Sequence, residues 1–328
     1  AGKEIESVNS IKNHATRIYA SQNRAVTAAD YEALIPKIYP ETQSVSVFGG
    51  EDLLPPQFGK VFITIKPFFG PFVPNSIKDN LKIILRKYSV AGIVPEILDL
   101  KYLYIETDSS VYYNQNLAPG ADFVKSIVSD NVNNYSNSIE LNKYGARFKY
   151  SRFQNIIDNS HESITSNITT VQMRRDLRAR LNQVANYEIC FGNEFYIKRL
   201  DGYNIKSSGF RVVGIDDVVY LGDIPNENQA IGELFLFKLE SPTKPAILKR
   251  SVGTVDYIKG EVLLDNINIV STLKNVQSQP VIEISACPKS NDVVGLQDLY
   301  LQLDTSASVL NMLSDEVSSG ADPSGTTY

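Results

Sequence analysis

The spacing of hydrophobic residues changes once along this chain, and the change limits the folds open to it. Up to about residue 175, segments with hydrophobic residues at three- and four-residue steps alternate with segments in which every second residue is hydrophobic. Beyond that point, and before the tail, only short β-type runs occur, separated by Gly, Pro, Asn and Asp. Because the two spacings reflect helix and strand geometry, the first part is expected to be mixed and the second mainly β.

The clearest helix is predicted directly after a strand. Residues 61–65 alternate as in a half-buried strand. Residues 77–88 then place one hydrophobic stripe opposite a row of charged side chains: Lys78, Asp79, Lys82, Arg86 and Lys87. Asn75 or Ser76 is expected to cap this helix, since short polar side chains accept hydrogen bonds from the first free amides. A strand, this helix and a further strand region from about residue 97 form a βαβ pattern.

An earlier helix is indicated by its cap. Thr27 is followed three residues later by Asp30, a spacing typical of a helix N-terminus, and Pro36 and Pro40 are expected to end the helix. Residues 8–19 also carry hydrophobic side chains at helical steps, which predicts another helix.

The resulting fold class is α+β. We expect a helical segment, then a ferredoxin-like or split βαβ-type sheet-and-helix domain, then a mainly antiparallel β domain of sandwich or barrel type, and last an acidic, partly disordered tail. The boundaries expected for these four parts are 1–41, 42–175, 176–303 and 304–328. Within the tail, a short helix is predicted at 309–313.

Composition excludes several classes of function. The formal net charge is −5, and the sequence does not indicate a basic surface. The phosphate contacts that nucleic-acid binding needs are therefore not expected. With only Cys190, Cys287, His14 and His161, neither a disulfide framework nor a multi-histidine or four-thiolate metal site is expected. No metal or other cofactor is predicted. No stretch has the apolar length of a membrane helix, and the N-terminus does not read as a signal peptide, which favours synthesis in the cytoplasm.

Motifs for catalysis are weak or incomplete. His161-Glu162 begins like a metalloprotease helix, but Thr165 stands where the second His belongs. The adjacent carboxylates Asp216 and Asp217 point to opposite faces if they lie in a strand, so they are more simply solvated turn residues. The cluster Arg174, Arg175, Arg178 and Arg180 is interpreted either as a contact for phosphate or an acidic partner or, preferably, as a solvated domain junction.

Two hydrophobic segments are candidate protein interfaces. Phe68, Phe69 and Phe72 lie in a loop broken by Pro and Gly, where they either dock into a partner or, as the preferred reading, fold back over the adjacent helix. The run Leu234, Phe235, Leu236 and Phe237 is hydrophobic on both faces of a strand. It is therefore either a central strand of the β domain, which is the preferred reading, or a strand buried by another chain.

Three stretches carry a resemblance to a known family. They are NRAVTAADYE at 23–32, SVSVFGGE at 44–51 and PPQFGKVFITIKP at 55–67. They closely resemble the baseplate wedge proteins (gene product six) of T-even-type contractile-tailed phages, within the baseplate J-like family. The match is dense over 23–112 and looser through 145–170, and the hairpin at 253–262 is also similar.

The resemblance implies a virion protein of the tail baseplate with no enzymatic activity. Such proteins pair with themselves as homodimers and with other wedge proteins, and the copies form a ring that ties the wedges together around the hub and stays intact while the baseplate rearranges. Members of the family are longer, and this sequence starts at Ala1 without Met, so the chain is expected to be a C-terminal half. The family has no catalytic residues to carry over. A receptor- or glycan-binding tail module remains the alternative, and an acid-base glycosidase is a third.

Overall fold

The computed structural model divides the chain into two compact units built from discontinuous segments. It describes the following residues: 19, 21–53, 55–198, 203–227, 230–241, 244–276, 278–296 and 298–315. Unit 1 comprises Ala1–Lys101, Asn142–Ala146 and Gly295–Tyr300, and unit 2 comprises Tyr102–Leu141, Arg147–Val294 and Leu301–Tyr328. The helix predicted over residues 8–19 lies almost wholly outside the described residues. The four boundaries predicted from the sequence stay predictions.

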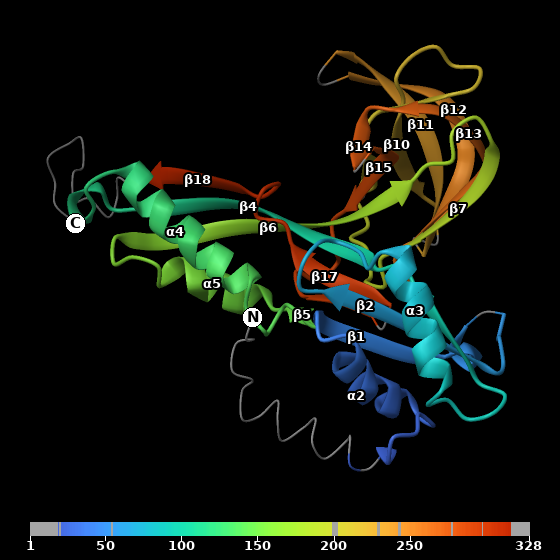
Figure 1. Ribbon diagram of the computed structural model, residues 1–328. Coiled ribbons are helices and arrows are strands. Elements are labelled where there is room, and N and C mark those ends of the chain that lie inside the picture. The colour runs from blue at the N-terminus through green and yellow to red at the C-terminus, as the bar shows by residue number, and fades with distance from the viewer. Residues whose placement is uncertain are drawn as a thin grey trace, which may run out of the picture. The chain divides into compact units, whose positions relative to one another are not determined.

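Unit 1 is a small sheet with two helices (Figure 1). Its elements are α2 (Ala28–Ile38), β1 (Thr42–Gly49), the 3-10 turn η1 (Gly50–Asp52), β2 (Lys60–Pro67), α3 (Asn75–Arg86) and β3 (Val94–Leu98). The strand order is β1-β2-β3, with β1 antiparallel and β3 parallel to β2. The parallel pair joined through α3 is the predicted βαβ pattern. Side chains of both helices and all three strands form one core, including Leu34, Ile35, Ile63, Leu81 and Leu85.

Helix α2 begins as predicted and ends between the two prolines that were predicted to close it. The Thr27 hydroxyl accepts from the Asp30 amide, and the Asp30 carboxylate accepts from the Thr27 amide at 2.8 Å, which forms a capping box. Pro36 does not end the helix, which continues to Ile38. In the last turn a proline removes only one internal hydrogen bond, so the helix tolerates it there.

Helix α3 has the predicted hydrophobic stripe, but two details predicted for it are wrong. Asn75 and Ser76 lie inside the first turn, and the N-cap is Pro74, which offers no side-chain acceptor. Lys78 lies on the buried side and not with the solvated charges, because its ammonium group forms an ion pair with Asp99. The pair lets the lysine stem cover the core while its charge stays compensated.

Two short segments from far along the chain complete unit 1. The Tyr144 amide donates to the Ser44 hydroxyl of β1 at 3.1 Å, and the Tyr144 and Tyr300 rings meet edge to face at 5.4 Å. The Tyr300 hydroxyl donates to the Asn142 side chain at 3.3 Å. These contacts place residues separated by more than 150 positions in one packed unit, which no local pattern in the sequence indicates.

Unit 2 contains a seven-stranded sheet with helices on one face (Figure 1). The order is β14 (Lys274–Val276), β15 (Gln279–Ala286), β6 (Ile164–Arg178), β4 (Lys101–Tyr113) and β17 (Leu299–Leu303), with β18 (Val309–Ser314) on β4 and β8 (Lys206–Ser207) on β15. Helices α4 (Ala121–Ser136) and α5 (Tyr150–Asp158) pack on it through Val124, Val128, Phe153 and Ile157. The remaining short elements here are η2 (Gln115–Leu117), β5 (Arg147–Phe148) and β16 (Val293–Val294).

The helix predicted at 309–313 is wrong, because Val309–Ser314 is the strand β18. It runs parallel to β4, with Val309 opposite Asp108 and Leu313 opposite Tyr112. A hydrophobic run this short fits either a helix or a strand by spacing alone. Pairing with β4, some 200 residues earlier in the chain, decides between the two.

The second sheet of unit 2 forms the predicted β-rich part. Its order is β10 (Tyr220–Pro225), β11 (Ile231–Ser241), β12 (Lys244–Asp256), β13 (Glu261–Thr272) and β7 (Val184–Cys190), with β9 (Phe210–Val212) on β13. All its pairs are antiparallel. The predicted hairpin turn between β12 and β13 contains Gly260 at φ +68°, a left-handed conformation that favours glycine. The predicted α+β class with a mainly antiparallel β domain is confirmed.

Candidate functional site

The phenylalanine loop after β2 leaves two of its three aromatic rings in solvent. Phe68 is 57 % exposed and Phe69 is 82 % exposed, whereas Phe72 is partly buried. The loop backbone is nevertheless held: the Phe68 amide donates to the Glu41 carbonyl at 2.8 Å, and Lys66 Nζ donates to the Gly70 carbonyl at 3.3 Å. Two adjacent exposed rings on a hydrogen-bonded loop are suited to docking into a partner.

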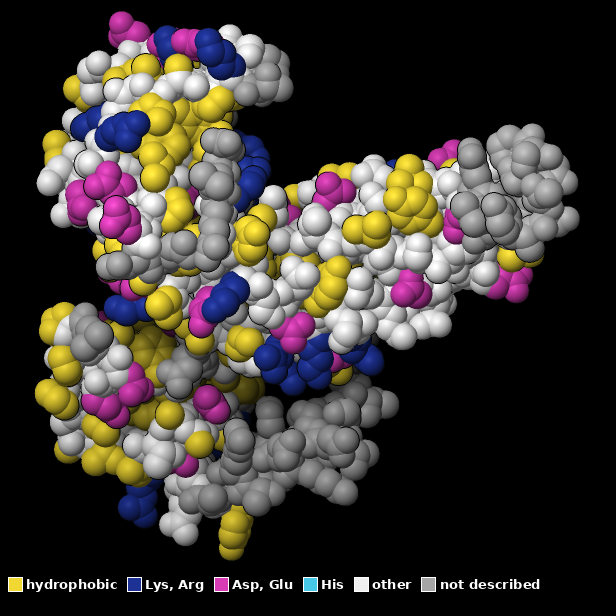
Figure 2. Space-filling model, turned by 180° about the vertical axis from the view of Figure 1, so that it is seen from behind, with side chains coloured by type: hydrophobic (Ala, Val, Ile, Leu, Met, Phe, Trp, Pro, Cys, Tyr) yellow, Lys and Arg dark blue, Asp and Glu magenta, His cyan; other side chains and the backbone are white. Residues whose placement is uncertain are grey.

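The second hydrophobic segment lies in the core of unit 2. Leu234, Phe235, Leu236 and Phe237 are all buried in β11, which pairs with β10 on one side and β12 on the other. This is the central-strand reading preferred from the sequence. Farther along the same hairpin Leu239, Ile247 and Leu248 are exposed, and hydrophobic side chains gather over this part of the molecule (Figure 2).

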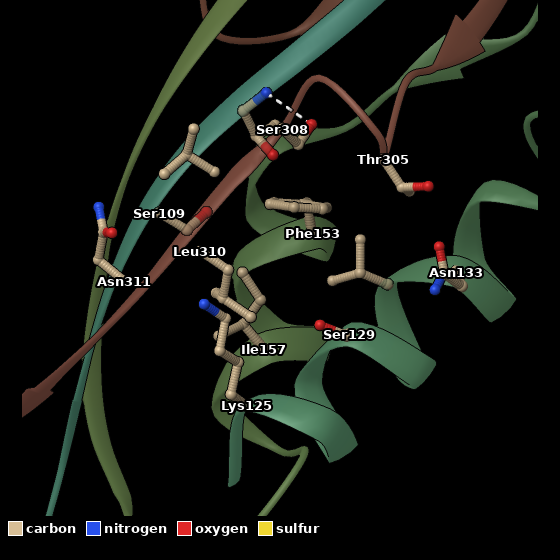
Figure 3. Close-up of a pocket in the computed structure, with 13 residues that line it drawn as sticks. Ser109, Lys125, Ser129, Asn133, Phe153, Ile157, Thr305, Ser308, Leu310 and Asn311 are labelled. Atoms are coloured by element: carbon tan, nitrogen blue, oxygen red, sulfur yellow. Dashed lines mark hydrogen bonds between the residues drawn. The ribbon is translucent and has the colours of Figure 1, made fainter. Parts of the chain in front are cut away.

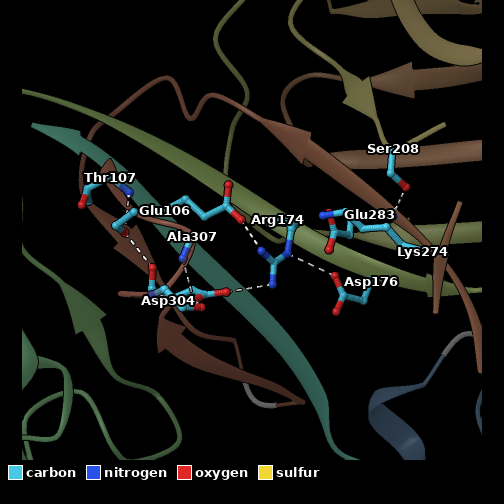
Figure 4. A network of polar contacts seen from close by, with 11 residues as sticks. Glu106, Thr107, Arg174, Asp176, Ser208, Lys274, Glu283, Asp304 and Ala307 are labelled. Atoms are coloured by element: carbon cyan, nitrogen blue, oxygen red, sulfur yellow. Dashed lines mark hydrogen bonds and ion pairs between the residues drawn. The ribbon is translucent and has the colours of Figure 1, made fainter. Parts of the chain in front are cut away.

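Arg174 is the centre of a buried polar network (Figure 4). Its guanidinium pairs with Glu106 of β4, with Asp176 at 3.2 Å and with Asp304 at 3.0 Å. It also lies over the Tyr104 ring, 4.4 Å from the ring centre. On β6, Arg174 stands opposite both Tyr104 of β4 and Ser285 of β15, so it marks the point where β6 is paired on both sides. The network therefore ties β4, β6 and the β17–β18 turn together.

Burial and the positive charge of Arg174 shift the pKa values of the surrounding carboxyl groups in opposite directions. Burial raises the pKa of Glu106 and of Asp176, and Arg174 opposes the rise in both. Burial also acts to raise the pKa of Asp304, but hydrogen bonds from Ser306 and the Ala307 amide, with Arg174, hold that pKa below its usual value. Burial, together with Asp176, raises the pKa of Tyr104 to about 12. The arrangement is an internal ion cluster, so Arg174 is not the solvated residue that the preferred interpretation of the arginine cluster expects.

A pocket of about 350 Å³ opens between α4, α5 and the β4–β18 edge (Figure 3). Its lining has a hydrophobic part and a polar part that comes from both α4 and the β18 region. The lining residues are Thr107, Ser109, Lys125, Ser129, Val132, Asn133, Phe153, Ile157, Thr305, Ser308, Val309, Leu310 and Asn311. Lys125 is the one ionisable residue among them, so the pocket offers no acid-base pair for catalysis.

The candidate residues for metal or acid-base chemistry have structural roles or lie at the surface. His161 Nδ1 lies 2.8 Å from the Ser163 hydroxyl in the turn before β6, and no metalloprotease helix is formed there. Glu188, Cys190 and Glu261 place ligand atoms within 4.8 Å of one another on β7 and β13. This group is exposed or partly exposed and offers one thiolate and two carboxylates, whereas a structural zinc site has four Cys or His ligands. No helix within the described residues is long and apolar enough to cross a membrane.

Comparison with known proteins bears on residues of both units. Residues 27–98 match the model of C-terminal domain I of the baseplate structural protein gp6, and residues 101–176 match that of its C-terminal domain III. The chain is a gp6-like baseplate protein. Both models describe C-terminal domains, so this gp6-like chain corresponds to a C-terminal portion, as the resemblance in its sequence implied.

One similar protein is itself a gp6 protein. The baseplate wedge protein gp6 of Enterobacteria phage T4 is 24 % identical over 247 residues, which is 72 % of this chain and 36 % of that protein. The gp6-like chain thus spans just over a third of the relative's length. Among solved structures, a chain of the anti-feeding prophage (AFP) baseplate aligns with a TM-score of 0.38 and 14 % identity, covering 51 % of this chain and 37 % of its own length.

The sequence identified the exposed phenylalanines and the arginine cluster but not what surrounds the cluster. Glu106 and Asp304 are 68 and 130 positions from Arg174 and carry no local signal of pairing. The pocket was missed for the same reason, because its walls come from residues 107–157 and 305–311. Only the strand pairing of β4 with β6 and β18 brings these residues together.

Proposed function

We propose that this gp6-like chain is a structural component of a phage tail baseplate wedge. Copies associate with one another, first as homodimers, and form a ring that ties the wedges together around the hub and stays intact while the baseplate rearranges on infection. Its partners are further copies of itself and other wedge proteins. It resides in the tail baseplate of the virion after assembly in the host cytoplasm, and it acts through contacts without catalysing a reaction.

The observation that carries this proposal is the pair of gp6 C-terminal domain matches, in sequence order along one chain. The chemistry of the described residues is consistent with it. The buried guanidinium of Arg174 is paired with carboxylates of this same chain, and the pocket between α4, α5 and β18 lacks an acid-base pair.

The Phe68–Phe69 loop is the proposed contact with another wedge protein. Exposed rings on a hydrogen-bonded loop lose little conformational entropy when a partner buries them, which is why aromatic residues dominate binding energy at interfaces. Phe58, which is 81 % exposed at the other end of β2, offers a matched control of the same residue type.

The test is co-purification of the chain with the other wedge proteins of the same phage, combined with sedimentation velocity of the chain alone. Phe68→Ser with Phe69→Ser is expected to weaken recovery of a wedge partner about tenfold or more, while Phe58→Ser leaves it unchanged. The free energy of unfolding of both variants should lie within about 0.5 kcal/mol of that of the unmodified chain, since the rings are exposed. Recovery of no wedge protein by the unmodified chain, and a monomer at every concentration, would contradict the proposed function.

A further inference from the structure

Strand β18 is an open edge of the seven-stranded sheet. It pairs with β4 on one side, and no other described strand pairs with it. Figure 1 shows it as the outer strand beside β4, with α4 over one face. A strand paired on one side only keeps alternate N–H and C=O groups available for another strand.

This edge has none of the features that usually prevent strand addition. Residues 308–314 read Ser-Val-Leu-Asn-Met-Leu-Ser, with no lysine, no proline and no charged side chain. The register with β4 runs without a bulge from Val309 to Ser314. Val309 is 48 % exposed and Leu313 is 40 % exposed. A regular, hydrophobic and uncharged edge strand is a surface that proteins normally cover.

The residue pattern of β18 indicates that a second copy of the same strand fits this edge. Read outward from Asn311, the segment has the same order of residue types in both directions: hydrophobic at 310 and 312, hydrophobic at 309 and 313, and serine at 308 and 314. In an antiparallel pair of two such strands centred on Asn311, Val309 faces Leu313, Leu310 faces Met312 and Ser308 faces Ser314. Each pair is therefore matched in polarity, as a two-fold interface requires.

The central residue fits a two-fold axis. Asn311 is exposed, and one of its amide N–H groups donates to Asp108 at 3.4 Å. The second N–H and the amide oxygen can exchange hydrogen bonds with Asn311 of another copy, because a primary amide is both donor and acceptor. Asp315, the nearest charged residue beyond the strand, would face Ala307 and so meet no like charge.

We propose that β18 pairs antiparallel with β18 of a second copy of this chain, with Asn311 on the two-fold axis, which joins the two sheets edge to edge. The inference rests on the proposed self-association and specifies one of its surfaces. A seven-residue strand pair spans about 20 Å and buries less than the roughly 1,000 Å² of a stable independent interface. It is therefore a weak contact by itself and gains strength when other contacts hold the copies together.

Two double variants that differ at one residue test the register. Val309→Lys with Leu313→Lys places lysine opposite lysine at two points, whereas Val309→Lys with Leu313→Glu places lysine opposite glutamate at both. Both positions are exposed, so the chain should fold in each case. Sedimentation equilibrium of the full 328-residue chain is expected to give a dissociation constant at least about tenfold weaker for the Lys/Lys variant than for the Lys/Glu variant.

A control separates edge pairing from stacking of the sheet's open face. Ile168→Lys adds a charge to an exposed residue of β6, paired with Ser110 and away from the edge, and should leave the dissociation constant unchanged. Equal dissociation constants for the two double variants, in a chain that self-associates, would overturn the β18 pairing and leave the proposed function standing. A chain that never self-associates would overturn both the β18 pairing and the proposed homodimer.

Discussion

Arg174 of β6 and Glu106 of β4 form an ion pair in which the arginine side chain is only 11 % exposed. Asp176 and Asp304 bind the same guanidinium, so one cation holds three carboxylates at the place where β6 is paired with both β4 and β15. Removal of the cation would leave three carboxylates close together with little solvent to screen them. The stability of the long strands of unit 2 therefore depends strongly on this one side chain.

Arg174→Ala is expected to lower the free energy of unfolding by about 3–5 kcal/mol, the usual cost of leaving buried charges without their partner. The measurement is urea unfolding followed by circular dichroism. Arg152→Ala is the matched control, since Arg152 forms an exposed pair with Glu140 at 3.0 Å and should cost less than about 1 kcal/mol. Equal losses for the two variants would mean that the network contributes little.

A buried carboxylate in the β-rich part should make stability depend on pH. Asp223 accepts from the Ile205 amide at 2.6 Å and from the Tyr257 hydroxyl at 2.5 Å, and burial raises its pKa despite these hydrogen bonds. A raised pKa in the folded state means that the folded protein binds this proton more tightly than the unfolded chain does. The resulting stability is complete below the unfolded pKa and is lost as pH rises through the folded pKa.

The unmodified chain should therefore lose stability relative to Asp223→Asn as pH rises from about 4, where an unfolded aspartate titrates. The measurement is the difference in unfolding free energy between the two proteins across pH 4 to 7 by urea titration, which cancels the contributions of other groups. A difference that stays constant or grows in favour of Asp223 with rising pH would contradict the assignment. Tyr257→Phe should cost about 1–3 kcal/mol, because it leaves the buried Asp223 carboxyl group without one of its hydrogen-bond partners.

The contribution of the Thr27 hydroxyl to the capping box of α2 can be measured by substitution. Thr27→Ala removes the hydroxyl that accepts from the Asp30 amide and is expected to cost about 1 kcal/mol. Thr27→Ser retains an acceptor and should cost much less. Thermal unfolding of the three proteins measures the difference, and equal losses for alanine and serine would show that the hydroxyl is not what stabilises this helix.

Gly50 is required by a close approach of two backbone segments. A Cβ atom at residue 50 would lie 1.9 Å from the Gln57 carbonyl oxygen, while the Gln57 amide donates to the Gly50 carbonyl at 2.8 Å. Gly50→Ala should thus cost at least about 1–3 kcal/mol, since neither backbone segment can move freely. Gly120→Ala, where an added Cβ meets no atom within 4 Å, is the control and should change stability little.

The elements predicted correctly are those fixed by neighbouring residues. Helix α3, strand β2 and the Thr27 cap depend on spacing and side-chain chemistry within about ten residues, and the structure has all three. Lys78 was misplaced because its partner, Asp99, lies 21 residues away. The spacing of residues shows which side of a helix is charged. It does not show which charged side chain on the helix is buried in an ion pair with a distant residue.

The remaining errors and omissions concern contacts between distant parts of the chain. Strand β18 was predicted as a helix because its pairing with β4 is invisible to local spacing. The completion of unit 1 by Asn142–Ala146 and Gly295–Tyr300, and the carboxylates around Arg174, have the same origin. For Phe68 and Phe69 the sequence favoured folding back over the adjacent helix, but the structure leaves both rings exposed, because a loop broken by Gly and Pro gives large side chains no regular surface on which to pack.

The proposed role as a baseplate component is tested most directly by cross-linking mass spectrometry on assembled tails of the phage that encodes the chain. The role predicts cross-links from this chain to a second copy of itself and to other wedge proteins, with sites in unit 1 near the Phe68–Phe69 loop. Tails that lack the chain, or that contain it with no cross-link to any baseplate protein, would contradict the proposal that it acts by holding neighbouring subunits together.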